Sequence, residues 1–369
     1  MSVASIRVLV VEDSLTMRRH LCQVLSREPD IEVVGEAEDG RRAIELCQRL
    51  RPDIVTMDMM LPVMTGLSAT EFIMAHCPTP ILVVSSSTNR GELFRTYEAL
   101  AAGAVDVLEK PRGDEPDGLW EQNFVWVVKL VSRIRVITHP RARLVGLTIP
   151  RTETRPAATT RSPDRQACQV VTIGASTGGP AAVVTLLRAL SSDFRLPILL
   201  VLHIAEPFAA ALAEWLDGVT PRRVVYARAG DQVAAMAGRV VMAPPGCHMV
   251  VRDRRLHLSD EPERHSCKPS VDVLFESIAR EYGPSATACL LTGMGRDGAS
   301  GMRDIRLAGG LTIAQDEQTS VVYGMPREAV LLGGAERVLA LDQIGPQLMA
   351  VAVSQPGPRS HERDNPDRG

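Results

Sequence analysis

A serine set between glycines stands in the middle of the chain. Gly174-Ala-Ser176-Thr-Gly178 fits the G-x-S-x-G pattern of a strand-to-helix turn that exposes a nucleophilic serine. The same glycines could instead let backbone N–H groups hold a phosphate at a helix N-terminus, with Ser176 acting only as a helix cap. The residues that could complete a catalytic site decide between these interpretations.

A serine nucleophile needs a base and a group that orients the base. Of the eight histidines, His203 follows a strongly apolar predicted strand, LPILLVLH, one strand–helix unit after Ser176. Asp297 follows another predicted strand, in TACLLTGMGRDG. The carboxyl ends of parallel strands meet at one edge of a sheet, so we expect these three residues to form a triad. Their order along the chain differs from that of the α/β-hydrolases and argues against an ordinary lipase or esterase fold.

A second set of polar residues follows the predicted strands of the first half of the chain. Glu12 and Asp13 follow the first strand, and Asp58 follows the third. Ser85 ends the fourth strand, and Lys110 follows the fifth. Carboxylate oxygens suit Mg²⁺, and a carboxylate can accept a phosphoryl group from a donor bound beside such an ion. The sequence therefore favours a phosphorylation site over a set of helix caps and surface charges.

Both sets depend on short apolar strands that alternate with longer helical segments. In the first half the expected strands are 6–11, 31–37, 53–57, 80–85 and 104–109, and a last helix is expected over Leu119–Ile137. In the second half the expected strands are 169–176, 196–203, 223–229, 239–245, 287–293, 311–316 and 336–341. This alternation predicts parallel sheets covered on both faces. We therefore expect two doubly wound α/β domains, the second with a mainly parallel sheet.

Composition supports two domains and excludes several classes of protein. The chain has 369 residues, 45% of them hydrophobic, and a net charge of -3, which gives no general attraction to nucleic acid or to an anionic membrane. Seven cysteines without a C-x-x-C pair argue against a disulfide framework and favour a reducing, cytoplasmic setting. The N-terminus lacks a signal-peptide pattern, and the longest apolar stretch is too short for a bilayer, so we expect no membrane insertion.

Changes in composition set the expected domain boundaries. The first domain is expected over 1–140 and the second over 168–352. The Arg-, Thr- and Pro-rich segment 141–167 is typical of a linker, and its lack of interleaved aromatic residues argues against a nucleic-acid-binding arm. The polar segment 353–369 is expected to be a disordered tail.

The motifs VLVVEDS, IVTMDMMLP, VVSSS and VLEKP resemble those of response-regulator receiver domains over nearly all of residues 5–137. The resemblance implies that Asp58 accepts the phosphoryl group and that Ser85 and Lys110 contact its oxygens. It also implies a set of Mg²⁺ ligands, which are Glu12, Asp13, Asp58 and the carbonyl of Met60.

Two positions depart from the common receiver pattern. Thr65-Gly66 stands where Asp-Gly is frequent, and Val107 stands where many receivers carry an aromatic switch residue. Both changes leave the phosphorylation chemistry intact. They leave open how the signal leaves the domain.

The motifs IGASTGG, LTGMGRDGASGM, PSVDVLF and VYGMPREA resemble the catalytic domain of the chemotaxis protein-glutamate methylesterase family, the CheB family. A receiver followed by this domain is the architecture of that family. The resemblance implies that Ser176 is the nucleophile, His203 the general base and Asp297 its orienting group. It also implies two further residues near the reacting atoms, which are Thr177 and Met294, whose N–H would help to form the oxyanion hole.

The resemblance implies hydrolysis of glutamate methyl esters, and deamidation of glutamines, on chemoreceptor signalling domains. It also implies a chemotaxis histidine kinase as phosphodonor, Mg²⁺ in the receiver and no cofactor for the ester reaction. Two loops differ from the common pattern: the segment after His203, and Cys267-Lys268, where His-Arg is frequent. The alternatives are a phospho-regulated receptor-binding protein with little esterase activity, and an esterase that acts on a receptor outside chemotaxis.

Overall fold

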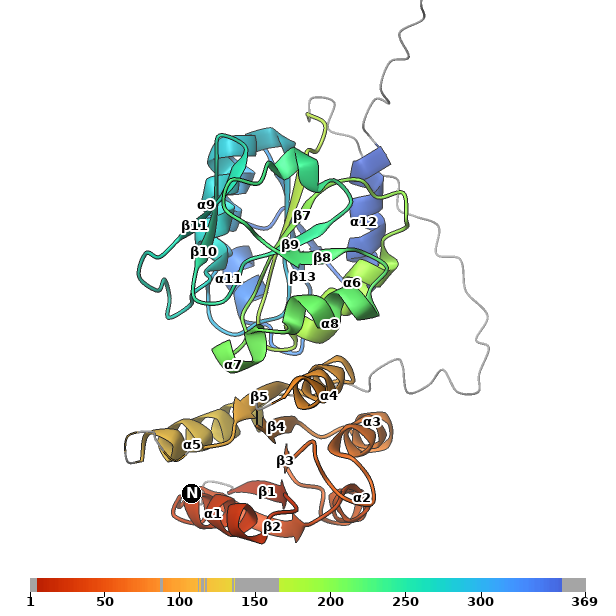
Figure 1. The fold of residues 1–369 in the computed structure, drawn as a ribbon, viewed down its shortest axis with the longest axis vertical. Helices are drawn as coiled ribbons and strands as arrows, with labels where there is room; N and C mark the ends of the chain where they lie inside the picture. Colours follow the sequence, from red (N-terminus) through yellow and green to blue (C-terminus); the bar gives the residue numbers. More distant parts are fainter. Residues whose placement is uncertain are drawn as a thin grey trace, which may run out of the picture.

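The structure is a computed structural model that describes residues 5–86, 89–111, 113, 116, 118–134, 136 and 166–353. Within these residues the chain forms two α/β domains, which Figure 1 shows one above the other. The expected linker lies outside the described residues except for 166–167, as does the expected tail except for Val353. No described helix combines the length and the apolar character needed to cross a membrane.

The N-terminal domain is built on a parallel sheet of five strands in the order β2-β1-β3-β4-β5. The strands are β1 (Ile6–Val11), β2 (Ile31–Ala37), β3 (Ile54–Met57), β4 (Ile81–Ser85) and β5 (Asp106–Glu109). The helices are α1 (Leu15–Leu25), α2 (Gly40–Leu50), α3 (Gly66–His76), α4 (Arg90–Ala101) and α5 (Leu119–Val131). The strand order reverses between β1 and β3, and binding crevices form at such a reversal.

Alternation along the buried strands sets the two faces of this sheet. Val8 and Val10 pack with α1 and α5, whereas Leu9 and Val11 pack with α2, α3 and α4. One expected boundary is wrong: α5 ends at Val131 rather than at residue 137. The chain turns there, and the Ser132 hydroxyl donates a hydrogen bond to a carbonyl of the last helical turn.

The C-terminal domain is built on a parallel sheet of seven strands in the order β14-β13-β12-β6-β7-β9-β8. Its strands are β6 (Val170–Ala175), β7 (Ile198–Leu202), β8 (Val224–Tyr226), β9 (Val240–Met242), β12 (Ala286–Leu290), β13 (Leu311–Gln315) and β14 (Arg337–Leu339). Its helices are α6 (Gly179–Ala189), α7 (Glu206–Ala209), α8 (Leu212–Val219), α9 (Val271–Tyr282), α10 (Ala299–Leu307), α11 (Met325–Leu331) and α12 (Leu341–Val353). Helices α6, α8 and α12 cover one face and α9, α10 and α11 the other. The order reverses between β6 and β12, the strands that precede Ser176 and Asp297.

An antiparallel hairpin that the sequence patterns do not predict, β10 (His248–Arg252) and β11 (Arg255–Ser259), lies outside the main sheet. Its turn residues Asp253 and Arg254 both have positive φ angles, 49° and 57°, as a tight hairpin turn requires. Charged residues occupy this turn where hairpins usually carry glycine, so the usual signal is absent. The hairpin packs through its apolar face against α9.

Helix α4 of the N-terminal domain packs against α6 and α8 of the C-terminal domain, as Figure 1 also shows. The Tyr97 hydroxyl donates a hydrogen bond to the Phe208 carbonyl, and the ring of Tyr97 lies 5.4 Å from that of Trp215. Arg90 forms an ion pair with Glu214. One apolar cluster therefore continues from the first domain into the second.

Candidate functional site

Ser176 lies on a sharp turn between β6 and α6. Gly178 directly precedes α6 and has a φ of +75°, and a Cβ there would come within 2.6 Å of the Val321 side chain, so only glycine fits. The carbonyl and the hydroxyl of Thr292 hold the turn, since they bond the Ser176 N–H and the Thr177 carbonyl, both at 3.0 Å. The N-cap of α6 is Gly178 with no side-chain cap. The geometry therefore does not support Ser176 as a helix cap.

His203 lies beside Ser176 at the same edge of the sheet. Ala175 and Leu202 are register partners in β6 and β7, and the His203 N–H donates a hydrogen bond to the Ala175 carbonyl at 3.0 Å. The expected adjacency of the two strands is confirmed. Among the described residues, no hydrogen bond joins the Ser176 hydroxyl to His203. In structures without substrate, catalytic hydrogen bonds are often long or poorly aligned.

Asp297 lies in the loop after β12, with its Oδ2 3.0 Å from His203 Nε2. Its carboxylate also accepts hydrogen bonds from the Ser270 hydroxyl (2.7 Å) and from the N–H groups of Val271 (2.7 Å) and Asp272 (3.0 Å), at the start of α9. Burial alone would raise the pKa of Asp297, but His203 and these donors outweigh it and hold the pKa below its usual value. Asp297 is therefore ionised at neutral pH and can orient an imidazole.

The same contact sets the protonation of His203. Burial alone would lower the pKa of His203, but the hydrogen bonds to Asp297 and Cys267 outweigh burial and raise it to about 9. In the conformation described here, the imidazole is therefore mostly protonated at neutral pH.

We expect basal ester hydrolysis to rise with pH because only neutral His203 can accept a proton. The neutral fraction grows about tenfold per pH unit below the pKa, so the rate should climb from pH 7 and level off near pH 9. The measurement is methanol release without phosphodonor, in the presence of EDTA, with the Ser176→Ala rate subtracted as background. Cys267→Ser should move the rise to lower pH, because the thiol is one cause of the raised pKa. A flat profile over this range would contradict the assignment of His203 as the base.

Cys267 also lies at this site, although the sequence shows it only as a departure from the common family pattern and does not predict a place beside His203. Its Sγ lies 3.7 Å from His203 Nδ1, on the ring nitrogen that does not face Asp297. Hydrophobic periodicity gives no signal for this contact, because it depends on the backbone angles of the turn before Cys267.

The two further residues named by the resemblance lie close to the serine. Thr177 follows Ser176 in the turn, and Met294 follows Gly293, where a Cβ would lie only 2.8 Å from Ser176 Cβ. In the part of the chain that the structure describes, the Met294 N–H has no hydrogen-bond acceptor. Its role as a donor to the oxyanion stays a prediction.

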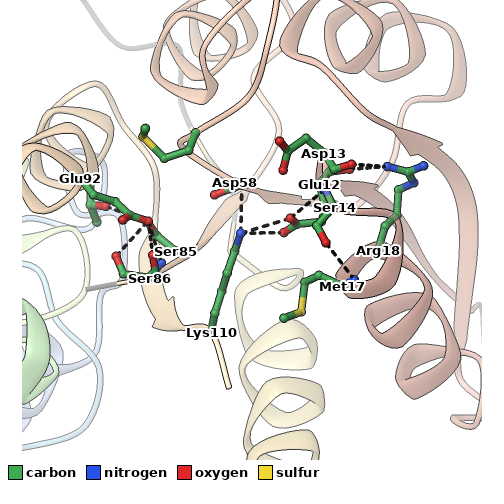
Figure 2. A network of polar contacts seen from close by, with 12 residues as sticks. Glu12, Asp13, Ser14, Met17, Arg18, Asp58, Ser85, Ser86, Glu92 and Lys110 are labelled. Carbon is green, nitrogen blue, oxygen red and sulfur yellow. Dashed lines mark hydrogen bonds and ion pairs between the residues drawn. The ribbon is translucent and has the colours of Figure 1, made fainter. Parts of the chain in front are cut away.

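Figure 2 shows the acidic cluster of the N-terminal domain. Lys110 Nζ lies 2.9 Å from Glu12 Oε2 and 3.0 Å from Asp58 Oδ2. Carboxylate oxygens of Glu12, Asp13 and Asp58 lie within 4.8 Å of one another. Burial and the charge of Asp58 raise the pKa of Glu12 to about 7, and burial raises that of Asp58. The possible ligand atoms are all oxygens, and the three carboxylates outnumber the single positive charge of Lys110. Such a set fits Mg²⁺.

Ser85 is placed differently from Lys110. Its hydroxyl donates a hydrogen bond to Glu92 Oε1 at 3.1 Å and lies 3.4 Å from the Thr96 hydroxyl, both on α4. Figure 2 shows Ser85 with Ser86 and Glu92, apart from the Lys110 contacts. Met60 lies in the loop after Asp58, and the role of its carbonyl as a ligand stays a prediction.

The domain interface reaches the Ser176 turn. The Thr177 side chain interacts with Asp106 in β5 and lowers the pKa of its carboxyl, but burial, the larger effect, raises that pKa to about 6. Val321, which contacts the turn at Gly178, packs against the apolar cluster of the N-terminal domain. The N-terminal domain therefore lies against the edge of the sheet that carries the candidate triad.

Comparisons with known proteins agree with this architecture. A family model described as CheB methylesterase matches residues 171–348, and one described as response regulator receiver domain matches residues 8–116. A protein of Anaeromyxobacter dehalogenans named protein-glutamate methylesterase/protein-glutamine glutaminase 2 is 45% identical over 92% of this chain and 95% of its own length. A protein-glutamate methylesterase/protein-glutamine glutaminase of Nitrosospira multiformis is 41% identical over 93% and 96%. The crystal structure of the Thermotoga maritima CheB methylesterase catalytic domain is 32% identical in sequence. The match spans 50% of this chain and 100% of the Thermotoga maritima chain, with a TM-score of 0.48.

The fold, the site and the two family-model matches define a two-domain response regulator, in which a receiver domain is joined to a hydrolase domain. The chain belongs to the CheB family of protein-glutamate methylesterases and protein-glutamine glutaminases. The fold class and the family expected from the sequence are confirmed. The alternative of a phospho-regulated receptor-binding protein with little esterase activity is not favoured.

Proposed function

We propose that this chain demethylates glutamate methyl esters, and deamidates glutamines, on chemoreceptor signalling domains, and that phosphorylation of Asp58 controls the reaction. The observation that carries the proposal is the placement of Ser176 and His203 at neighbouring strand ends, with His203 bound to ionised Asp297. The printed names of the relatives support the substrate class.

The ester reaction follows from these positions. His203 accepts the proton of Ser176 as Oγ attacks the ester carbonyl, and Asp297 stabilises the imidazolium. The Met294 N–H, beside the serine turn, donates to the oxyanion, a contribution of about 3 kcal/mol for such a donor. His203 then gives this proton to the methoxide oxygen as the tetrahedral intermediate collapses, and methanol leaves. A water molecule, deprotonated by His203, cleaves the acyl-enzyme and restores the Ser176 hydroxyl, which leaves a glutamate side chain.

Phosphorylation would begin with attack by the Asp58 carboxylate on a phosphoryl group from a chemotaxis histidine kinase. Glu12, Asp13 and Asp58, with the Met60 carbonyl, would hold Mg²⁺, which neutralises charge on the transferring group. Lys110, already 3.0 Å from Asp58, would contact the phosphoryl oxygens. The Ser85 hydroxyl would have to leave Glu92 on α4 to reach them.

The proposed movement of the Ser85 hydroxyl from Glu92 to the phosphoryl group connects Asp58 to the domain interface. Helix α4 bonds the Ser85 hydroxyl through Glu92 and contacts the catalytic domain through Tyr97. A change in the Ser85 contacts therefore alters the helix that holds the two domains together. In the proposed mechanism, phosphorylation shifts the population toward an arrangement in which the Ser176 edge is open to a receptor.

The experiment is methanol release from methyl-labelled chemoreceptor membranes, with and without a small-molecule phosphodonor. We expect release to increase several-fold with phosphodonor, because an open Ser176 edge admits the receptor. Asp58→Asn should keep the basal rate and lose the increase, while Asp53→Asn, at an exposed position before β3, serves as the matched control. Equal stimulation of the Asp58→Asn protein would place the phosphorylation site elsewhere, and no release under any condition would contradict the proposed substrate.

A further inference from the structure

Three potential metal ligands of different chemistry meet at the Ser176 edge. Cys267 Sγ lies 3.7 Å from His203 Nδ1, and His203 Nε2 lies 3.0 Å from Asp297 Oδ2. One ligand atom from each of the three lies within 4.8 Å of the others. The triad mechanism assigns proton transfer to His203 and orientation to Asp297, and no chemical step to Cys267.

We propose that Cys267 and His203 together bind a soft divalent cation, Zn²⁺ above all, and that the bound ion switches the esterase off. Zinc–sulfur and zinc–nitrogen bonds of about 2.3 and 2.05 Å at a tetrahedral angle place the two ligand atoms about 3.6 Å apart. The separation of Sγ and Nδ1 is 3.7 Å. The two side chains therefore lie at the spacing that a shared zinc ion requires, without a change in the backbone.

Asp297 supplies the outer partner that such a site needs. A histidine that binds a metal through one ring nitrogen usually donates its other N–H to a carboxylate, which fixes the ring and strengthens the ligand. His203 Nε2 lies 3.0 Å from Asp297 Oδ2, which is the distance of such a contact. Asp297 is itself fixed by three hydrogen bonds from the start of α9.

The turn that presents Cys267 is held in an unusual conformation. Arg264 and Cys267 exchange two backbone hydrogen bonds, and between them His265 and Ser266 have φ angles of 54° and 58°. Residues other than glycine adopt this left-handed region at a cost and keep it only where the surroundings hold them. Here an ion pair from Arg264 to Glu276, and a contact from His265 to an α9 carboxylate, hold the turn. Cys267 is therefore directed at His203 by a supported turn.

The donor atoms select the kind of ion. A thiolate and an imidazole favour Zn²⁺ over Mg²⁺, which prefers oxygen ligands. The all-oxygen cluster of the receiver domain has the opposite preference. Mg²⁺ would therefore bind in the receiver domain and Zn²⁺ at Cys267 and His203. An ion on His203 Nδ1 occupies the ring nitrogen that does not face Asp297, and so removes the base from the reaction. This inhibition rests on the proposed function, whereas binding of the ion does not.

Binding can be measured on the full chain with Co²⁺ as the probe, in excess Mg²⁺ to saturate the receiver. A cobalt ion bound by a thiolate shows an intense near-ultraviolet charge-transfer band. We expect the band in the native protein and in Cys247→Ser, which removes another partly exposed cysteine of the same domain, and its loss in Cys267→Ser. Zn²⁺ should abolish the band by displacing Co²⁺. Absence of the band from the native protein, or its persistence in Cys267→Ser, would overturn the proposal.

Inhibition is measured by methanol release with increasing Zn²⁺, each variant normalised to its own rate in EDTA. Loss of a metal-site partner weakens binding by about 10–100-fold, so Cys267→Ser should need at least about tenfold more Zn²⁺ for half inhibition. Equal sensitivity of the native and Cys267→Ser proteins would refute the inhibitory role. A thiolate band in a protein that releases no methanol would contradict the proposed function and leave the metal site established.

Discussion

Ser176→Ala is expected to lower methanol release at least about 10⁴-fold, because removal of the nucleophile from a serine triad disables the whole unit. The backbone of the turn should be unaffected. The Ser176 N–H and carbonyl, rather than its hydroxyl, make the contacts to Thr292 and Gly179 that hold it. The loss should therefore appear in kcat with an unchanged melting temperature.

The matched control is Ser191→Ala. Ser191 follows α6 at the opposite edge of the sheet, and within the described residues its hydroxyl has one hydrogen-bond partner, the Met349 sulfur at 3.8 Å. It should retain full activity. If Ser176→Ala kept more than about one hundredth of the native rate, the hydroxyl of Ser176 would not be the nucleophile, and the glycine-rich turn would need another explanation.

The position of the candidate triad could be predicted because it depends on strand order alone. Two apolar segments in succession predict neighbouring parallel strands, and the residue after each strand then falls at one edge, as Ser176 and His203 do. Asp297 follows from the same rule, since its strand, β12, pairs with β6 on the other side. No side-chain geometry is needed for this inference.

Contacts made by turns could not be predicted in this way. Cys267 reaches His203 only because two residues other than glycine adopt left-handed backbone angles, and hydrophobic periodicity carries no signal for such angles. The Ser85 hydroxyl was expected near the phosphoryl group, and its bond to Glu92 depends on a side-chain rotamer. The hairpin of β10 and β11 could not be predicted for a similar reason, because its turn is formed by charged residues and not by glycine.

Asp297→Asn should lower kcat by about 10⁴-fold while leaving the serine in place. The Asp297 carboxylate accepts hydrogen bonds from Ser270 and from the start of α9, and its Oδ2 lies 3.0 Å from His203 Nε2. An asparagine oxygen that keeps the Ser270 bond turns its NH₂ group toward His203. Nε2 must then act as an acceptor, so the ring proton moves to Nδ1 and that nitrogen can no longer take a proton from Ser176.

The pH profile separates this effect from a structural one. Without the Asp297 charge, the pKa of His203 loses its main support and should fall from about 9 toward or below its usual value of about 6.5. The residual activity of Asp297→Asn should therefore level off at lower pH than native activity does. The variant should also melt at lower temperature, since the Val271 N–H loses a buried acceptor worth about 1–3 kcal/mol. Asp193→Asn, at an exposed position on the far side of the sheet, should change none of these. A variant that is less stable but has a native pH profile would mean that Asp297 holds α9 without acting on His203.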